Sequence, residues 1–123
     1  MYENSVLNVT LPAAADYSTT GQYLCVKINT SGRAEVIASQ GVDCIGILQN
    51  DPSALGRAAT VAVGGVCKAM SGDTLTAGVK VTAGADGRVE TAATGDFVIG
   101  WTMTAANDGE ILSLLLTHQD VSA

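Results

Sequence analysis

Apolar and polar residues alternate through the last third of the chain. Residues 97–104 (FVIGWTMT) follow the two-residue period of a β-strand. Residues 105–109 (AANDG) follow as a turn, because Asn and Asp tolerate unusual backbone angles and Gly accepts a positive φ. Residues 110–117 lead back as a second strand.

This second strand is apolar on both faces. One face consists of Leu112, Leu114 and Leu116. The other face consists of Ile111, Ser113 and Leu115. A strand of this kind needs cover on both sides, and a small domain offers only one core. We therefore expect the leucine face, together with Trp101, to serve the fold, and the opposite face to contact a second subunit.

Shorter segments with the same alternation precede this hairpin and are separated by turn residues. They are residues 5–11, 22–29, 33–38, 43–49, 57–63, 66–70, 79–82 and 88–91. No segment of ten or more residues has a helical period, and residues 50–56 hold at most one helical turn. The pattern predicts a mainly β fold: a compact, barrel-like or sandwich-like (β-tulip-type) domain of short strands with at most one or two short helical turns.

The chain is expected to divide into an extended N-terminal arm (residues 1–20), one β-rich domain (21–118) and a C-terminal tail (119–123). The arm contains no Lys or Arg, and Pro12 separates its alternating segment from the body. Two interpretations stay open. The segment is either part of the body, as the first strand of its sheet or as a frayed terminus, or it adds a strand to the open sheet edge of another protein. In the second case its apolar contacts are Val6, Leu7, Val9 and Leu11.

A short sequence is echoed within the chain. Ile45-Gly46-Ile47 recurs as Ile99-Gly100-Trp101. Each copy precedes a turn that contains Asp and ends in Gly, and an apolar strand follows. Two copies are too few for a solenoid. The echo predicts two similarly built strand pairs, with glycine where two backbones approach closely.

Length and charge exclude several partners. The 123 residues indicate one domain. The 12 acidic residues exceed the 6 basic ones, which argues against nucleic acid, since binding to phosphates depends on Lys and Arg. No stretch approaches the roughly 20 apolar residues needed to span a bilayer, and no signal peptide is visible. We expect neither a nucleic acid nor a membrane partner.

Candidate chemistry is sparse. The three cysteines, Cys25, Cys44 and Cys67, match no zinc or CxxC spacing and are expected to be buried free thiols. His118 is the only histidine, so neither a Ser-His-Asp nor a Cys-His arrangement is supported. The acidic residues lie mostly at predicted turns, where Asp bonds its own backbone. We expect no catalytic residue, no cofactor and no metal site.

One motif suggests a carrier function instead. Residues 71–78 (SGDTLTAG) have the GDxLxxG shape of biotin- and lipoyl-carrier domains, which present a modified Lys at a hairpin tip. Lys68 lies just before the motif, which is the wrong place. The motif is also weakly specific, because it merely turns a chain between two strands. A carrier domain is therefore the alternative from a different functional class.

Several glycine-containing motifs follow one another in a fixed order. They are the opening strand at residues 21–26, Gly64-Gly65-Val66, Ser71-Gly72-Asp73, residues 78–81, residues 86–89, and Ile99-Gly100 followed by the terminal strand at residues 111–116. Their order and spacing resemble the capsid decoration (cement, or head-stabilising) proteins of tailed bacteriophages. The resemblance covers residues 21–117, and the connection at residues 50–56 departs from the pattern.

The resemblance implies a structural virion protein without enzyme activity. It implies a β-rich domain, often a homotrimer, that binds the outer surface of the assembled capsid and stabilises the head. It also implies an arm that contacts the major capsid protein, which maps onto residues 1–20. Such a protein is made in the cytoplasm of the bacterial host and ends in the virion. The alternative within the virion is another non-enzymatic component, such as a trimeric fibre or tail head domain.

Overall fold

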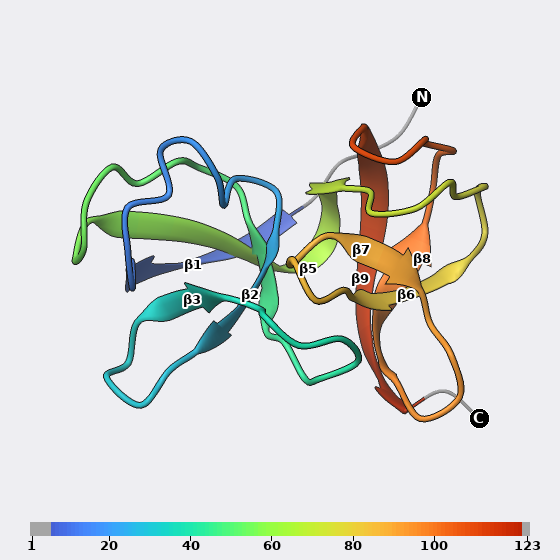
Figure 1. Ribbon diagram of the computed structural model, residues 1–123, viewed down its shortest axis with the longest axis horizontal. Helices are drawn as coiled ribbons and strands as arrows, with labels where there is room; N and C mark the ends of the chain where they lie inside the picture. The colour runs from blue at the N-terminus through green and yellow to red at the C-terminus, as the bar shows by residue number, and fades with distance from the viewer. Residues whose placement is uncertain (1–5, 122–123) are drawn as a thin grey trace.

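A computed structural model describes the backbone of residues 6–121 and the side chains of residues 7–117. Within this range the chain is all β, with no helix, and it forms one 9-stranded antiparallel sheet (Figure 1). The strands are β1 (Val6–Pro12), β2 (Cys25–Ile28), β3 (Ala34–Val36), β4 (Gly46–Leu48), β5 (Ala58–Met70), β6 (Lys80–Ala83), β7 (Val89–Thr91), β8 (Phe97–Thr102) and β9 (Ile111–Val121). The prediction of a mainly β fold is confirmed.

The sheet curls into two halves that share the long strand β5. The strands follow the order β3-β2-β4-β5-β9-β8-β6-β7, and β1 pairs with β5 off this path. The first part of β5 pairs with β1 and β4, and its last part pairs with β9. Figure 1 shows β5 bending between the half that contains β1–β4 and the half that contains β6–β9. The result is a curled, half-barrel arrangement.

β5 is a single strand of 13 residues, whereas the sequence predicted two strands separated at Gly64-Gly65. That prediction is wrong. The register of the β1–β5 ladder shifts between Leu7, which pairs with Gly64, and Asn8, which pairs with Ala62, directly beside this glycine pair, and Gly65 has a φ of 79°. A β-bulge of this kind bends a strand and increases its twist without ending it. The glycines therefore make the bend that joins the two halves.

Several of the predicted segments pair with their neighbours as hairpins. β2 pairs with β3 around the turn at residues 29–33, and β6 pairs with β7 around residues 84–88, where Gly87 has a φ of 84°. β8 pairs with β9, as the pattern at residues 97–117 predicted. β9 continues to Val121 and so includes residues 119–121 of the predicted tail. Residues 1–5 of the predicted arm and 122–123 of the tail lie outside the described residues.

The main core lies between the two halves, and β9 contributes one face to it. Leu112, Leu114 and Leu116 are buried there, so the predicted core face of this strand is confirmed. A second, smaller cluster contains residues such as Val26, Leu48 and Val61, and Leu11 packs against it from β1. Both clusters are built mainly from aliphatic side chains. Their burial, about 25 cal/mol per Å² of apolar surface, drives the folding of this glycine-rich chain.

The two echoed glycines lie where backbones touch. A Cβ atom on Gly46 would lie 2.0 Å from the carbonyl oxygen of Ala62, and one on Gly100 would lie 2.1 Å from that of Leu115. The prediction of glycine at close backbone approaches is confirmed at both positions. Only a residue without a side chain fits between these paired strands.

Candidate interaction surfaces

β9 presents an exposed apolar face opposite its core face. Ile111 is 41% exposed and Leu115 is 39% exposed, whereas Leu114, which lies between them, is fully buried. Ser113 is partly exposed on the same face. The structure thus places the three residues of the predicted subunit contact together on one outward face.

Neighbouring strands extend this face. In the ladder, Leu115 lies opposite Trp101 of β8 on one side and Val66 of β5 on the other. Residues directly opposite in an antiparallel pair share a face, so Trp101 points outward with Leu115. The assignment of Trp101 to the core is therefore wrong. Lys80 on β6 is its other ladder partner, and the Lys80 Nζ atom lies 5.4 Å from the centroid of the Trp101 ring.

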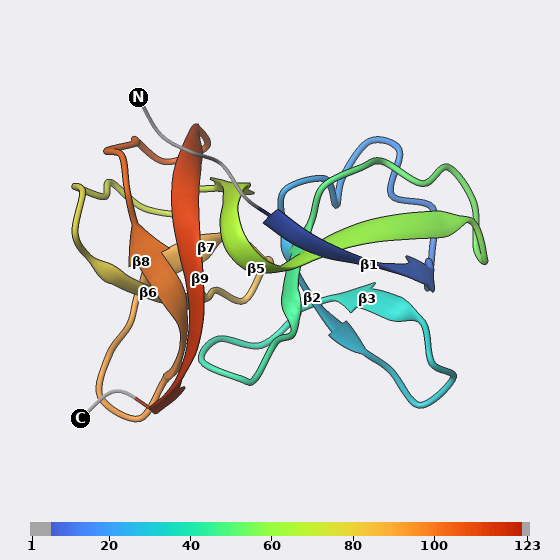
Figure 2. The same cartoon turned by 180° about the vertical axis from the view of Figure 1, so that it is seen from behind.

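We call this surface the outer face. It consists of Val66, Lys68, Met70, Trp101, Ile111, Ser113 and Leu115. Figure 2 shows β9 at its centre, with β5 on one side and β8 on the other. The sequence pattern identified only the β9 residues, because alternation along one strand does not reveal which strands lie beside it. An apolar sheet face left partly exposed in this way is typical of a protein contact.

A cavity of about 430 Å³ opens beside the outer face. Ile111 and Met70 line it together with Tyr17, Tyr23 and Arg88. Tyr23 has a φ of 67°, which is unusual for a residue other than glycine. Its N–H donates to the carbonyl of Leu48 and its carbonyl accepts from the N–H of Met70, so hydrogen bonds on both sides hold this conformation. The cavity offers room for a side chain from a protein bound at the outer face.

The apolar residues of the predicted arm lie on or beside β1. Leu7 is 64% exposed and Val9 is 38% exposed, while Leu11 is partly buried against the second core cluster. The side chain of Val6 lies outside the described residues. The segment pairs with β5, and is thus a strand of the body's own sheet, which was the first of the two interpretations left open. Two apolar side chains of this strand are nevertheless available to a partner.

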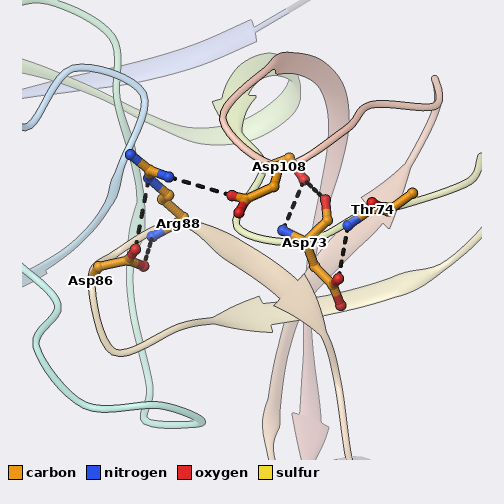
Figure 3. A network of polar contacts seen from close by, with 6 residues as sticks. Asp73, Thr74, Asp86, Arg88 and Asp108 are labelled. Carbon is orange, nitrogen blue, oxygen red and sulfur yellow. Dashed lines mark hydrogen bonds and ion pairs between the residues drawn. The ribbon is translucent and has the colours of Figure 1, made fainter.

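A network of polar contacts joins the turn before β7 to the turn before β9 (Figure 3). The Arg88 guanidinium lies 3.7 Å from a carboxylate oxygen of Asp86 and 3.4 Å from one of Asp108. These ion pairs are largely exposed, so each contributes at most about 1 kcal/mol. Asp86 also accepts the Arg88 N–H, and Asp73 accepts the Thr74 N–H, which confirms that turn carboxylates bond nearby backbone. The network is thus structural support for the turns.

Acidic groups concentrate around Glu90 on β7. Burial raises the pKa of Glu90, and the carboxylates of Asp86, Asp73, Asp108 and Asp96 raise it further. Each of these groups makes a further negative charge unfavourable. Negative charge is therefore concentrated at this end of the molecule.

The three cysteines are free and buried, as predicted, and all belong to the main core. A hydrogen bond with Cys44 and burial raise the pKa of the Cys25 thiol well above its ordinary value. Burial raises the pKa of Cys67 to about 12. A thiol in this state is a poor nucleophile, because the thiolate is the reactive form. The cysteines therefore act as small core residues.

The other candidate groups do not assemble a site within the described residues. No cluster of three or more His, Cys, Asp or Glu side chains in that range could hold a metal ion. The side chain of His118 lies outside the described residues. Lys68 lies within β5 opposite Ser113, whereas a carrier domain presents its lysine at a hairpin tip. No helix in the described range is long and apolar enough to cross a membrane.

The fold and its surfaces define a structural β-domain with an exposed apolar sheet face. The phage cement protein family matches residues 8–115, and the chain belongs to this family. It is therefore a structural protein of the phage virion.

The fold also matches a solved phage structure. The head fiber gp8.5 N base of bacteriophage phi29 matches 97% of this chain and 100% of its own, with a TM-score of 0.71 and 15% sequence identity. At this identity the likeness shows a shared fold. No curated protein sequence matches the chain.

Proposed function

We propose that this protein binds the outer surface of an assembled phage capsid and stabilises the head. Membership of the phage cement protein family carries this proposal. A protein that binds the finished shell, and not the loosened one, stabilises the shell by mass action. This role needs surfaces for binding and no catalytic centre.

Self-association into a homotrimer is the second part of the proposal, and the outer face supports it. Ile111 and Leu115 are too exposed to serve the core of their own chain, and Val66 and Trp101 join them in one continuous surface. Burying such a face between subunits gains about 25 cal/mol for each Å² of apolar surface. Three joined subunits present three N-terminal segments to the shell at once, which raises the effective concentration of each.

The N-terminal segment is the proposed contact with the major capsid protein. Its exposed side chains, Leu7 and Val9, lie on a strand without any charged residue. The proposed organisation is thus a segment at residues 1–20 that contacts the shell, a domain that trimerises, and a short tail at residues 119–123. Synthesis in the bacterial host precedes binding to the virion.

The fold match to a head fiber base favours a second candidate function. In that case the chain is the base of a fibre that projects from the head. Both candidates place the chain on the capsid, and they differ in whether a projecting domain is attached to it.

Binding to purified, undecorated capsids tests the proposal. The protein is mixed with capsids of the phage that encodes it. The washed particles are imaged, and the amount of protein bound per capsid is measured. We expect saturable addition in groups of three and a higher temperature of capsid disruption. Capsids that bind no protein at saturating concentration would exclude the proposal. A projecting density continuous with each bound group in native virions would favour the fibre base.

A further inference from the structure

The two ends of the sheet path are capped by the chain itself. At the β3 end, the Ala14 N–H donates to the Ala34 carbonyl at 2.9 Å. At the β7 end, the Gly72 N–H donates to the Val89 carbonyl at 2.8 Å. Proteins cover exposed sheet edges in this way because unpaired N–H and C=O groups recruit other strands.

The outer edge of β1 is treated differently. β1 lies off the sheet path and, among the described strands, pairs only with β5. Charged side chains, especially Lys, commonly protect an open sheet edge from pairing with another chain. The 7 residues of β1 include no charged residue. Asn8 and Thr10 are exposed. Within the described residues, an uncharged edge is therefore left open on this side.

The direction of the main-chain groups follows from the partners of Thr60. Thr60 donates its N–H to Asn50 Oδ1 at 2.9 Å and accepts the Gln49 N–H at 2.8 Å, so both of its groups point away from β1. Thr10 lies directly opposite Thr60. Opposed residues in an antiparallel pair exchange both hydrogen bonds or neither. The N–H and C=O of Thr10 consequently point to the outer edge.

The same orientation applies two residues along the strand in each direction. Asn8 lies on the same side of the register shift as Thr10 and shares its orientation, because main-chain groups alternate sides along a strand. Pro12 also falls on this alternation. Proline lacks an N–H and is tolerated in a strand where that group faces away from the ladder. Its presence in β1 agrees with this assignment.

We propose that the outer edge of β1 accepts an extended strand of the major capsid protein, bonded to the main chain of Asn8 and Thr10. This inference rests on the proposed function and gives its capsid contact a mechanism, strand addition. The chain thus receives a strand at β1, whose inner edge is already paired with β5.

Symmetry favours the capsid protein over a second copy as the occupant. Pairing of two β1 edges would create a two-fold contact that closes on itself, whereas the proposed trimer is joined through the outer face. A proposed trimer leaves each edge free for a different protein.

Proline substitution at Thr10 tests the proposal. Thr10→Pro removes the outward N–H and places a ring where the added strand would lie, without removing a hydrogen bond to β5. Asn8→Pro repeats the test at the other position, and Thr10→Ala is the control because it keeps the N–H. Each protein is titrated against undecorated capsids of the encoding phage, with thermal unfolding and sedimentation velocity measured in parallel.

Both proline variants are expected to fold and self-associate like the unsubstituted protein and to bind capsids roughly tenfold or more weakly, while Thr10→Ala binds normally. Equal capsid binding by the folded proline variants overturns the inference and leaves the proposed function intact. Unfolding of both variants also overturns it, because these N–H groups would then be hydrogen-bonded to β5. A changed oligomeric state with unchanged capsid binding identifies a second copy as the occupant. If the unsubstituted protein does not bind capsids, the proposed function itself is excluded.

Discussion

Leu114 and Leu115 are adjacent in β9 and lie on opposite faces, so alanine at each position separates folding from association. Leu114 is fully buried between Cys67 of β5 and Thr102 of β8. Leu114→Ala removes buried methyl groups and leaves a cavity, which costs about 2–5 kcal/mol. In a chain of this size a loss of 1 kcal/mol lowers Tm by about 3–5 °C, so we expect a decrease of roughly 6–25 °C.

Leu115→Ala acts on the outer face instead. Because the side chain is 39% exposed, its removal costs less than about 1 kcal/mol in the isolated chain. The same change removes a central side chain of the proposed subunit contact. Tm of the unsubstituted protein is expected to rise with protein concentration, as for any assembly that unfolds with dissociation. Leu115→Ala reduces this dependence, and Leu114→Ala preserves it.

Thermal unfolding over a hundredfold range of concentration, with sedimentation velocity at each end, distinguishes the two effects. Equal losses of Tm for the two variants at low concentration would refute the assignment of Leu114 to the core and Leu115 to the outer face, since they would place both side chains in the core. The proposed subunit contact is equally refuted by unchanged self-association of Leu115→Ala, which would remove the outer face from it.

Four further substitutions test the packing and the buried thiol of Cys67. Gly100→Ala is expected to cost at least about 1–3 kcal/mol in urea unfolding, because its Cβ would meet the Leu115 carbonyl, while Gly64→Ala, with only ordinary contacts at 3.6 Å or more, costs less. Thr82→Val is expected to stabilise the protein by about 1–2 kcal/mol, because the buried Thr82 hydroxyl has no hydrogen-bond partner among the described residues; a loss of stability would contradict this. The pKa of Cys67 is about 12 when folded against an ordinary 9.0, so the unfolded chain loses this proton first and stability falls as pH rises from 9 toward 12; Cys67→Ala should flatten that decline in a series of unfolding curves.

Local sequence pattern predicted the strands and the buried face of β9 well. Alternation identifies which side chains of one strand face the same way, so Leu112 and Leu114 could be assigned together before their partners were known. The glycine echo worked for a related reason. A glycine between apolar neighbours in a strand indicates that a second backbone approaches closely there. Gly46 and Gly100 each lie against a carbonyl of the strand paired with them.

Features that depend on pairing between distant segments could not be read from the pattern. Gly64-Gly65 has the composition of a strand end, yet β5 continues through it, because β1 and β9 supply hydrogen-bond partners on either side of the bend. Trp101 was assigned to the fold together with the leucine face of β9, whereas its ladder partners Leu115 and Lys80 place it on the outer face. In both cases the outcome depends on which strand lies alongside, and this is decided by the whole sheet.

The two proposed surfaces depend on each other energetically. The outer edge of β1 offers few main-chain groups, and a net gain of about 1 kcal/mol for each hydrogen bond is small against the cost of immobilising two partners. One edge alone would therefore hold a capsid strand weakly. A trimer joined through the outer face presents three edges on one rigid body, and the second and third contacts then form at a high effective concentration. Affinity for the capsid consequently depends on side chains such as Leu115, which belong to the outer face and not to β1.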